Sequence, residues 1–247
     1  MRDSAGFRVV LITSNLSGGV DLDAMSRRRF LRYGVWSAVL AAVGALTAYL
    51  LMRRPEASSS GTGRLPPGQS EVAGLQVLHI DGIPDIDVDK WVFEVDGEVE
   101  NPVKLGWNDF LQLPKTTDVS DFHCVTGWTK LDNRWEGVRF KEIANLVRPT
   151  VRAKYATIEC DGDVTYTTSL PLEDLLRDHV LFAYGLDGKP LEPRYGGPVR
   201  LVVPQKYAYK SAKWVKRVRF TERQEIGFWE SGGYSNTADP WINDRYA

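Results

Sequence analysis

Apolar and polar residues alternate with a period of two in several stretches of the chain, and this pattern predicts short β-strands. KWVFEVDGEV, residues 90–99, places Trp91, Phe93 and Val95 on one face and reaches a turn at Asp96-Gly97. The other strand patterns are KYATIECDGDVTYTTSL (residues 154–170, two strands around an Asp-Gly turn), PVRLVVP (residues 198–204) and WVKRVRF (residues 214–220).

Short helical patterns lie between these strands. They are GWNDFLQLP (residues 106–114), FKEIANLVRP (residues 140–149) and LEDLLRDH (residues 172–179), and a proline ends each of the first two. The elements do not alternate as βαβ units, and no internal repeat of roughly 20–50 residues is present. The pattern predicts an α+β fold, with mainly antiparallel mixed sheets and short helices, in a single domain at residues 72–247.

The first part of the chain follows a different pattern. Residues 34–52 form a run of 19 residues without a charge, close to the ~20 that span a bilayer as a helix. They follow SRRRFL, residues 26–31, which fits a twin-arginine export signal. We therefore expect an N-terminal region with this signal (residues 1–33), a transmembrane anchor or signal segment (residues 34–52) and a flexible Ser/Gly/Pro-rich linker (residues 53–71). The domain would then lie outside the cytoplasm, anchored to the bacterial inner membrane.

Charge is distributed unevenly. Residues 1–70 hold nine Lys/Arg and four Asp/Glu, whereas the remainder holds 22 and 28. Within this acidic remainder, residues 194–220 carry eight Lys/Arg and no acid. One interpretation is that these residues form the solvated faces of strands, which suits Arg217 and Arg219.

The alternative interpretation of the basic stretch is an anion site. Gly196-Gly197 would let the backbone approach a ligand closely. The side chains that would surround a phosphate are Arg200, Lys206, Lys210 and Lys213, with the Ser211 hydroxyl as a further donor. Tyrosines and a tryptophan among these cations also suit nucleic acid, but a net-acidic exported domain disfavours that partner.

The chain has two cysteines, Cys124 and Cys160. Cys124 lies in DFHCVTGWTKLDNRWEGV, residues 121–138, and composition leaves four roles open for it: half of a disulfide, a nucleophile, a metal ligand or a buried apolar residue. A nucleophile activated by His123 is disfavoured, because neighbouring residues of a strand point to opposite faces. Gly-x-Gly-x-x-Gly, Walker-type, His-Glu-x-x-His and Cys-x-x-Cys motifs are absent, so nicotinamide, ATP and structural zinc lose support.

Three segments together resemble the sulfite-oxidase family of molybdenum enzymes: HCVTGW (residues 123–128), WEG (residues 135–137) and GKPLEPRYGGPVRLVVPQKYAYKSAKWV (residues 188–215). The resemblance extends from Val72 to Thr221 and is closest to the single-domain bacterial branch. It implies the sulfite-oxidase fold and one molybdenum–molybdopterin per chain. In that family a cysteine of the matching segment is the only protein ligand of the metal, which implies that Cys124 is the molybdenum ligand and displaces the disulfide with Cys160. A soft thiolate suits a soft, redox-active metal.

The resemblance also implies residues that contact the pterin. Those that match phosphate-binding positions, or share their loop, are Arg200, Lys206, Lys210, Ser211, Ala212 and Lys213. Looser matches are His79, Cys160 and Tyr195, and the last two depart from the threonine and asparagine of the family. Arg134 and Arg139 follow Cys124 closely in sequence, and we expect one of them to face the substrate.

The activity that the resemblance implies is oxygen-atom transfer at a cysteine-ligated molybdenum, in the direction of reduction of an S-oxide such as methionine sulfoxide. Sulfite oxidation by the same site is an alternative, as is a non-catalytic exported domain that kept the fold. The implied partners are a small-molecule or protein-bound sulfur substrate and a membrane haem or quinone-linked electron donor, with the membrane reached through the N-terminal helix and no nucleic acid.

Overall fold

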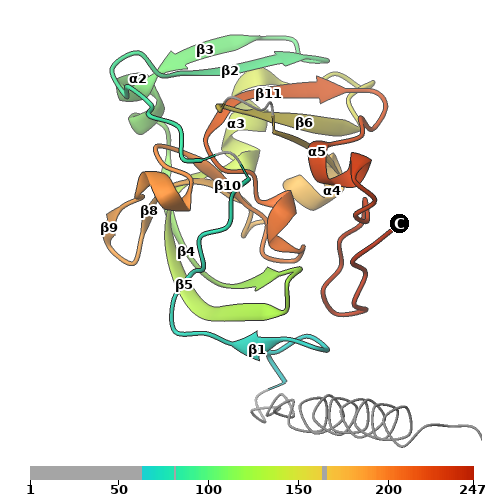
Figure 1. The fold of residues 1–247 in the computed structure, drawn as a ribbon. Helices are drawn as coiled ribbons and strands as arrows, with labels where there is room; N and C mark the ends of the chain where they lie inside the picture. Colours follow the sequence, from blue (N-terminus) through green and yellow to red (C-terminus); the bar gives the residue numbers. More distant parts are fainter. Residues whose placement is uncertain (1–62, 81, 163–165) are drawn as a thin grey trace, which may run out of the picture. The chain divides into compact units, whose positions relative to one another are not determined.

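Two β-sheets share one core in the computed structural model, which describes residues 63–80, 82–162 and 166–247 (Figure 1). The first sheet contains β1 (Ser70–Glu71), β4 (Lys115–Cys124), β5 (Trp128–Arg139), β8 (Leu181–Leu186), β9 (Lys189–Pro190) and β10 (Arg200–Val202). The second has the order β3 (Val103–Gly106), β2 (Val92–Gly97), β11 (Val215–Thr221), β6 (Tyr155–Cys160), β7 (Thr167–Pro171). Most neighbouring strands are antiparallel; β1 with β5 and β11 with β2 are parallel. The expected mainly antiparallel α+β architecture is confirmed.

The helices are short and fill the connections. They are α2 (Trp107–Leu111), α3 (Phe140–Val147), α4 (Leu172–Leu175) and α5 (Phe228–Ser231), with 3-10 turns η2 (Pro193–Tyr195) and η3 (Ala208–Lys210). Among the described residues, no helix is long and apolar enough to cross a bilayer. The run at residues 34–52, where the sequence predicts an anchor, lies outside the described part of the chain.

Helix α3 shows how the sequence pattern sets the packing. Its apolar residues follow helical spacing, so Phe140, Ile143, Ala144 and Val147 share one buried face. The helix ends where Arg148 adopts a left-handed conformation with φ 54°, directly before a proline that cannot continue it. The buried face joins a core that includes residues of both sheets, among them Phe93, Val95, Ile158, Phe182, Leu201 and Val218. This core fixes the two sheets against each other.

A second apolar cluster surrounds the long β4–β5 hairpin. It contains Phe122, Cys124, Trp128, Trp135, Leu181, Ala183, Leu191 and Val202. At the far end of the hairpin Gly137 lies so close to β8 that a Cβ there would be 2.0 Å from the carbonyl oxygen of Phe182. A side chain at this position of the WEG segment is therefore excluded by the approach of the two backbones.

Residues 64–72, which we call the N-terminal strap, lie along this hairpin, although residues 64–71 were expected to end a flexible linker. The Ser70 amide donates to the carbonyl of Gly127 at 2.9 Å, and β1 pairs with the start of β5. Arg64 forms ion pairs with Asp121 at 2.5 Å and Asp132 at 2.7 Å. Backbone pairing and ion pairs place the strap on the folded domain.

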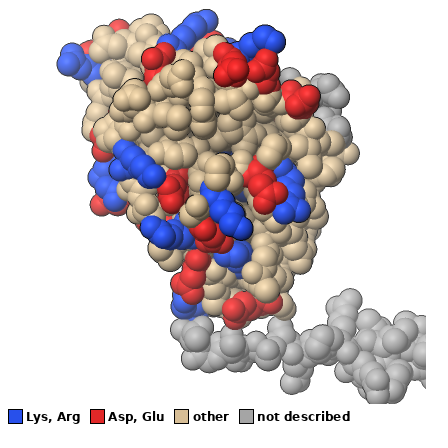
Figure 2. All heavy atoms as spheres, turned by 90° about the vertical axis from the view of Figure 1, so that its left-hand side faces the viewer, with Lys and Arg blue, Asp and Glu red and all other residues tan. Residues whose placement is uncertain are grey.

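Acidic and basic side chains are interspersed over the face that Figure 2 shows, which carries strands β8 and β9. The basic residues of β11 follow the same rule: Arg217 is paired with Asp96 at 2.5 Å, and Arg219 with Glu225 at 2.8 Å. The side chains of Arg217 and Arg219 are 33% and 38% exposed, and neighbouring strands and loops supply opposite charges to both.

Candidate functional site

A cavity opens between the β4–β5 turn, the chain after the strap and the segment from β10 to η3. The residues that line it include Leu75, Leu78, His79, Phe122, Cys124, Thr126, Trp128, Cys160, Arg194, Tyr195, Arg200, Tyr209, Ser211, Ala212, Lys213, Trp229 and Tyr234. Eight of the residues predicted to bind a cofactor are in this set: His79, Cys124, Cys160, Tyr195, Arg200, Ser211, Ala212 and Lys213. Residues from distant parts of the sequence thus meet at one cavity.

Cys124 ends β4 and begins a tight turn. The Gly127 amide donates to the carbonyl of Cys124 at 3.0 Å, which closes the turn before β5 starts. The Cys124 side chain lies in the cavity wall, with its Sγ atom 3.2 Å from Thr126 Oγ1. Both cysteines are free thiols in the structure. Cys124 therefore presents an unbridged sulfur at the cavity surface.

Arg200, on β10, is a buried cation in the same wall. Its guanidinium donates to the carbonyls of Tyr195 at 2.8 Å and Ser211 at 2.9 Å, and it lies over the rings of Phe122 and Trp135. No carboxylate among the described residues pairs with it. Burial lowers the pKa of Arg200 to about 9, which means that burial disfavours its charge. An anion in the cavity would offset that cost.

Two more donors flank Arg200. The Ser211 hydroxyl accepts the Val203 amide at 2.9 Å, which leaves its own hydrogen available. Lys213 reaches across the cavity to the Leu78 carbonyl at 2.7 Å, and its ammonium lies over the Trp214 ring. Trp128 also has a buried indole N–H without a partner in the described structure. The cavity wall is thus rich in donors that suit an anionic, polar ligand.

The remaining predicted contacts line the cavity with different chemistry. Cys160 is fully buried, and burial raises its pKa to about 12, so it stays a protonated thiol at neutral pH. The His79 ring accepts the Gly82 amide through Nδ1 at 3.2 Å. Tyr195 follows Arg194, whose guanidinium lies 4.8 Å from the centre of the Tyr195 ring. These three residues can contact a ligand without supplying a second thiolate.

The structure does not bring Lys206 and Lys210 to the cavity lining. Lys206 turns to Asp174, with a distance of 2.9 Å between Nζ and Oδ2. Lys210 is fully buried and paired with Glu230, and its ammonium also donates to the Ser169 carbonyl. The loop directs the side chains of Lys206 and Lys210 into the protein. There they link the loop to α4 and α5 through ion pairs.

Arg134 and Arg139 also lie outside the cavity lining, because β5 carries them away from the turn at Cys124. Arg134 is exposed, and its backbone pairs with Asp187 in the loop between β8 and β9. Their closeness to Cys124 in sequence therefore does not become closeness in space.

Several residues at the site carried no sequence signal. Gln69 lies in a Pro/Gly/Ser-rich stretch, yet its side chain donates to the carbonyl of Cys124 at 3.1 Å. Arg245 donates to the carbonyl of Val125 at 2.8 Å from 120 residues further along the chain.

His123 points away from the cavity, toward Thr129 and the Trp241 ring. Burial lowers the pKa of His123, which favours its neutral form.

Three aromatic side chains in contact, Tyr209, Trp229 and Tyr234, form an aromatic wall of the cavity. Trp229 and Tyr234 lie edge to face with ring centres 5.5 Å apart, and Tyr234 contacts Tyr209 at 5.3 Å. The Tyr209 hydroxyl donates to the Ser235 carbonyl at 2.6 Å, which fixes its ring in the wall. The cavity lining thus combines cationic and aromatic side chains.

Most of the residues that line the cavity lie in a segment that matches a known family. Residues 79–229 match the family model described as the oxidoreductase molybdopterin binding domain. The chain belongs to this family. It is 40% identical over 189 residues to the uncharacterized oxidoreductase YuiH of Bacillus subtilis, a match that covers 76% of this chain and 94% of the relative. The protein is an oxidoreductase of the sulfite-oxidase type, and its cofactor is a molybdopterin.

More distant relatives agree with this membership. The chain is 26% identical over 230 residues to the protein-methionine-sulfoxide reductase catalytic subunit MsrP of Campylobacter jejuni, covering 83% of this chain and 76% of the relative. The sulfane dehydrogenase SoxCD of Paracoccus pantotrophus has a similar fold, with a TM-score of 0.54 and 22% identity. That match covers 58% of this chain and 41% of the SoxCD chain, so this chain spans less than half of the SoxCD chain. The expected molybdopterin-binding fold is confirmed.

The residues of the cavity fit this cofactor. A phosphate group suits the buried Arg200 guanidinium, which pairs with no carboxylate in the described part of the chain, together with the available Ser211 hydroxyl hydrogen and the nearby Lys213 ammonium. The unbridged thiol of Cys124 in the same cavity wall suits molybdenum as a soft donor. The unpartnered indole N–H of Trp128 can donate to a polar atom of the ligand.

Proposed function

We propose that this protein reduces an S-oxide, such as methionine sulfoxide, at a molybdenum that Cys124 holds in the cavity. The observation that carries the proposal is the position of the Cys124 thiol in one cavity with the buried Arg200 cation and the aromatic wall. When bound, the molybdopterin supplies a two-electron redox centre for oxygen-atom transfer. The similarity to MsrP of Campylobacter jejuni supports the S-oxide direction.

Different residues of the cavity bind the phosphate of the cofactor and the metal. Arg200, Ser211 and Lys213 would bind the phosphate of the cofactor and set its orientation, because β10 and the loop after η3 bring these three side chains to the same cavity. Cys124 holds the metal as a thiolate, and Thr126 can donate a hydrogen bond to its sulfur at 3.2 Å. Residues Phe122 and Trp128 shield this sulfur from water within the second apolar cluster.

The aromatic wall is the proposed substrate side. Rings of Tyr209, Trp229 and Tyr234 form an apolar surface, which suits the methyl group and thioether product of methionine sulfoxide reduction. Leu75 and Leu78 add apolar side chains to the cavity lining. This arrangement favours a neutral sulfur compound over a small anion such as sulfite.

We further propose that the protein works outside the cytoplasm with a membrane haem or quinone-linked electron donor. The support comes from the sequence, in which a twin-arginine motif precedes an uncharged run at residues 34–52.

The experiment that tests the reaction uses protein purified with its cofactor. With a reduced viologen dye as electron donor, methionine sulfoxide should oxidise the dye, whereas sulfite with ferricyanide should give a rate lower by about tenfold or more, equivalent to about 1.4 kcal/mol in transition-state binding. Faster sulfite oxidation would overturn the S-oxide proposal. Purified protein without molybdenum would favour a non-catalytic binding domain instead.

Arg200→Lys should lower the amount of bound cofactor by about tenfold, because lysine keeps the charge and loses the planar fork that holds two carbonyls and an anion. The measurement is molybdenum and oxidised-pterin fluorescence per mole of purified protein. Arg217→Lys is the matched control: it changes another strand arginine, paired with Asp96 away from the cavity, and should keep the cofactor. Full cofactor content in Arg200→Lys would contradict this role.

A further inference from the structure

The turn that carries Cys124 is held from outside by both ends of the described chain. Gln69 Nε2 donates to the carbonyl of Cys124 at 3.1 Å, and the Ser70 amide donates to the carbonyl of Gly127 at 2.9 Å. Arg245 Nη1 donates to the carbonyl of Val125 at 2.8 Å. Three of the four carbonyls of residues 124–127 therefore have donors from outside the hairpin.

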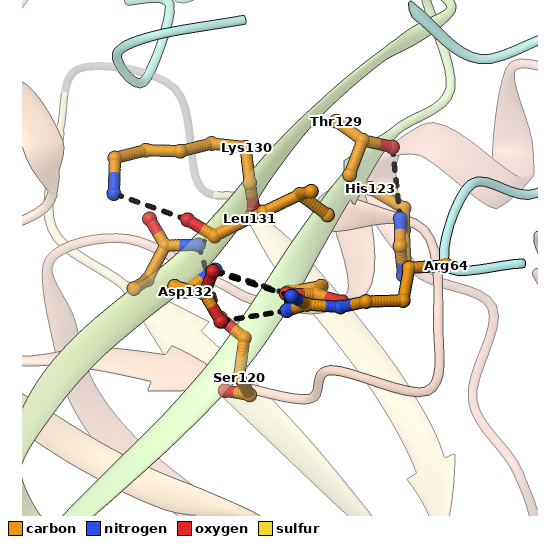
Figure 3. Close-up of polar contacts among 9 residues, drawn as sticks. Arg64, Ser120, His123, Thr129, Lys130, Leu131 and Asp132 are labelled. Atoms are coloured by element: carbon orange, nitrogen blue, oxygen red, sulfur yellow. Dashed lines mark hydrogen bonds and ion pairs between the residues drawn. The ribbon is translucent and has the colours of Figure 1, made fainter. Parts of the chain in front are cut away.

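Gln69 does more than contact the turn, because it belongs to a ring of three buried hydrogen bonds that the backbone between His123 and Cys124 closes. Thr129 Oγ1 lies 3.2 Å from Gln69 Oε1 and 2.9 Å from His123 Nδ1. His123 is covalently joined to Cys124, whose carbonyl Gln69 binds. The exposed fractions of Gln69, His123 and Thr129 are 3%, 4% and 0%, so water does not compete for these bonds. Figure 3 shows the contact of His123 with Thr129.

The donors and acceptors of this ring follow from its geometry. A carbonyl can only accept, so the end of the Gln69 amide that faces Cys124 is the NH₂ group, and the oxygen faces Thr129. The single hydroxyl hydrogen of Thr129 then goes to Gln69. Thr129 must accept from His123, which assigns the hydrogen of the imidazole to Nδ1. Each of the three hydrogen bonds therefore has one possible donor and one possible acceptor, so the ring has a single pattern of hydrogen positions.

The strap brings Gln69 to this place. Arg64 bridges Asp121 on β4 and Asp132 on β5, where Asp132 has a φ of 53° (Figure 3). The Asp121 carboxylate also accepts the Asp132 amide at 2.9 Å. Pairing of β1 with β5 continues the contact, so the strap docks on both strands that flank the Cys124 turn.

We propose that Gln69 is a positioning residue for Cys124: through the ring with Thr129 and His123 it fixes the backbone that aims the Cys124 sulfur into the cavity. The strap is thereby part of the metal site, although it contributes no atom to the cavity wall. This inference rests on the proposed role of Cys124 as the metal ligand. Partners behind a metal ligand commonly change metal affinity or activity by about 10–100-fold.

The test uses a pair of substitutions at Thr129. Thr129→Val removes the hydroxyl and keeps the branched shape, whereas Thr129→Ser keeps the hydroxyl and removes a methyl group. Two readouts need no substrate: hydrogen exchange of the Gly127 amide in the full-length protein, and the electron paramagnetic resonance signal of molybdenum(V) in cofactor-loaded enzyme. We expect Thr129→Val and Gln69→Leu to speed the exchange by about tenfold and to shift the signal, and Thr129→Ser to retain both.

Gln205→Leu is the matched control. Gln205 makes the same kinds of contact, to the Asp174 carbonyl at 3.0 Å and to His179 Nε2 at 2.9 Å, but outside the cavity lining, and its loss should leave both readouts unchanged. Equal effects of Thr129→Ser and Thr129→Val would show a packing role and overturn the proposal, as would unchanged readouts in Gln69→Leu. If Gln69→Leu does not fold, the Thr129 pair decides. Failure of the wild type to reduce S-oxides would contradict the proposed reaction and leave these readouts intact.

Discussion

Cys124→Ser is expected to lose molybdenum and S-oxide reductase activity by more than about 100-fold, beyond the roughly 10–100-fold effect of removing a partner behind a ligand. The hydroxyl of serine is a hard donor that is not ionised at neutral pH, so it does not replace a thiolate on a soft metal. The fold should be retained, because serine is close to cysteine in size and the second apolar cluster keeps its other members. Molybdenum content by mass spectrometry and turnover with methionine sulfoxide measure the effect.

Cys160→Ala is the matched control for this substitution. Cys160 lines the same cavity but has a pKa raised to about 12 by burial, so it is a neutral thiol and should be dispensable as a ligand. We expect Cys160→Ala to retain most of its molybdenum. Retention of molybdenum in Cys124→Ser together with its loss in Cys160→Ala would show that Cys160 is the ligand and would refute the proposed site.

Lys210→Met is expected to destabilise the protein by about 3–5 kcal/mol. The side chains of Lys210 and Glu230 are 0% and 1% exposed, so removal of the ammonium leaves a buried carboxylate whose remaining partner is Thr168. Burial lowers the pKa of Lys210, and the Glu230 carboxylate opposes that shift by stabilising the ammonium. The free energy of unfolding in urea gives the measurement.

A double substitution separates the ion pair from packing. Lys210→Met with Glu230→Leu removes both charges and should recover most of the lost stability, because an apolar pair of similar volume has no uncompensated charge. Lys104→Met provides the surface comparison: Lys104 is 69% exposed and pairs with Glu94, and its loss should cost less than about 1 kcal/mol. Equal losses in the single and double variants would attribute the effect to packing.

The elements that the sequence predicts are those with strong local patterns. Helix α3 has four apolar residues at helical spacing and a proline after its end, and β2, β6 and β11 have period-two alternation. Which strands pair is not local: β2 joins β11 across more than 100 residues, and its parallel register depends on the shared core. The long β4–β5 hairpin was also not predicted as a hairpin, because its strands mix polar and apolar residues around a bulge at Asp121.

The candidate site also contains residues that the sequence could place and residues that it could not. Cys124, Arg200, Ser211 and Lys213 could be placed together by the resemblance of two segments, and the cavity contains them all. The same loop also carries Lys210, which points into the protein toward a partner on α5. Sequence could not distinguish these lysines, because the direction of a side chain in an irregular loop depends on which carboxylate lies behind it.

The contact of Arg245 with the Cys124 turn has a consequence for biosynthesis. A ribosome adds residues in order, so the turn at residues 124–127 leaves it 120 residues before the arginine that binds the Val125 carbonyl. During that interval the turn lacks one of its three outside donors, whereas Gln69 and Ser70 are already present. The turn that carries Cys124 therefore gains its full set of these three outside donors only after translation has passed residue 245.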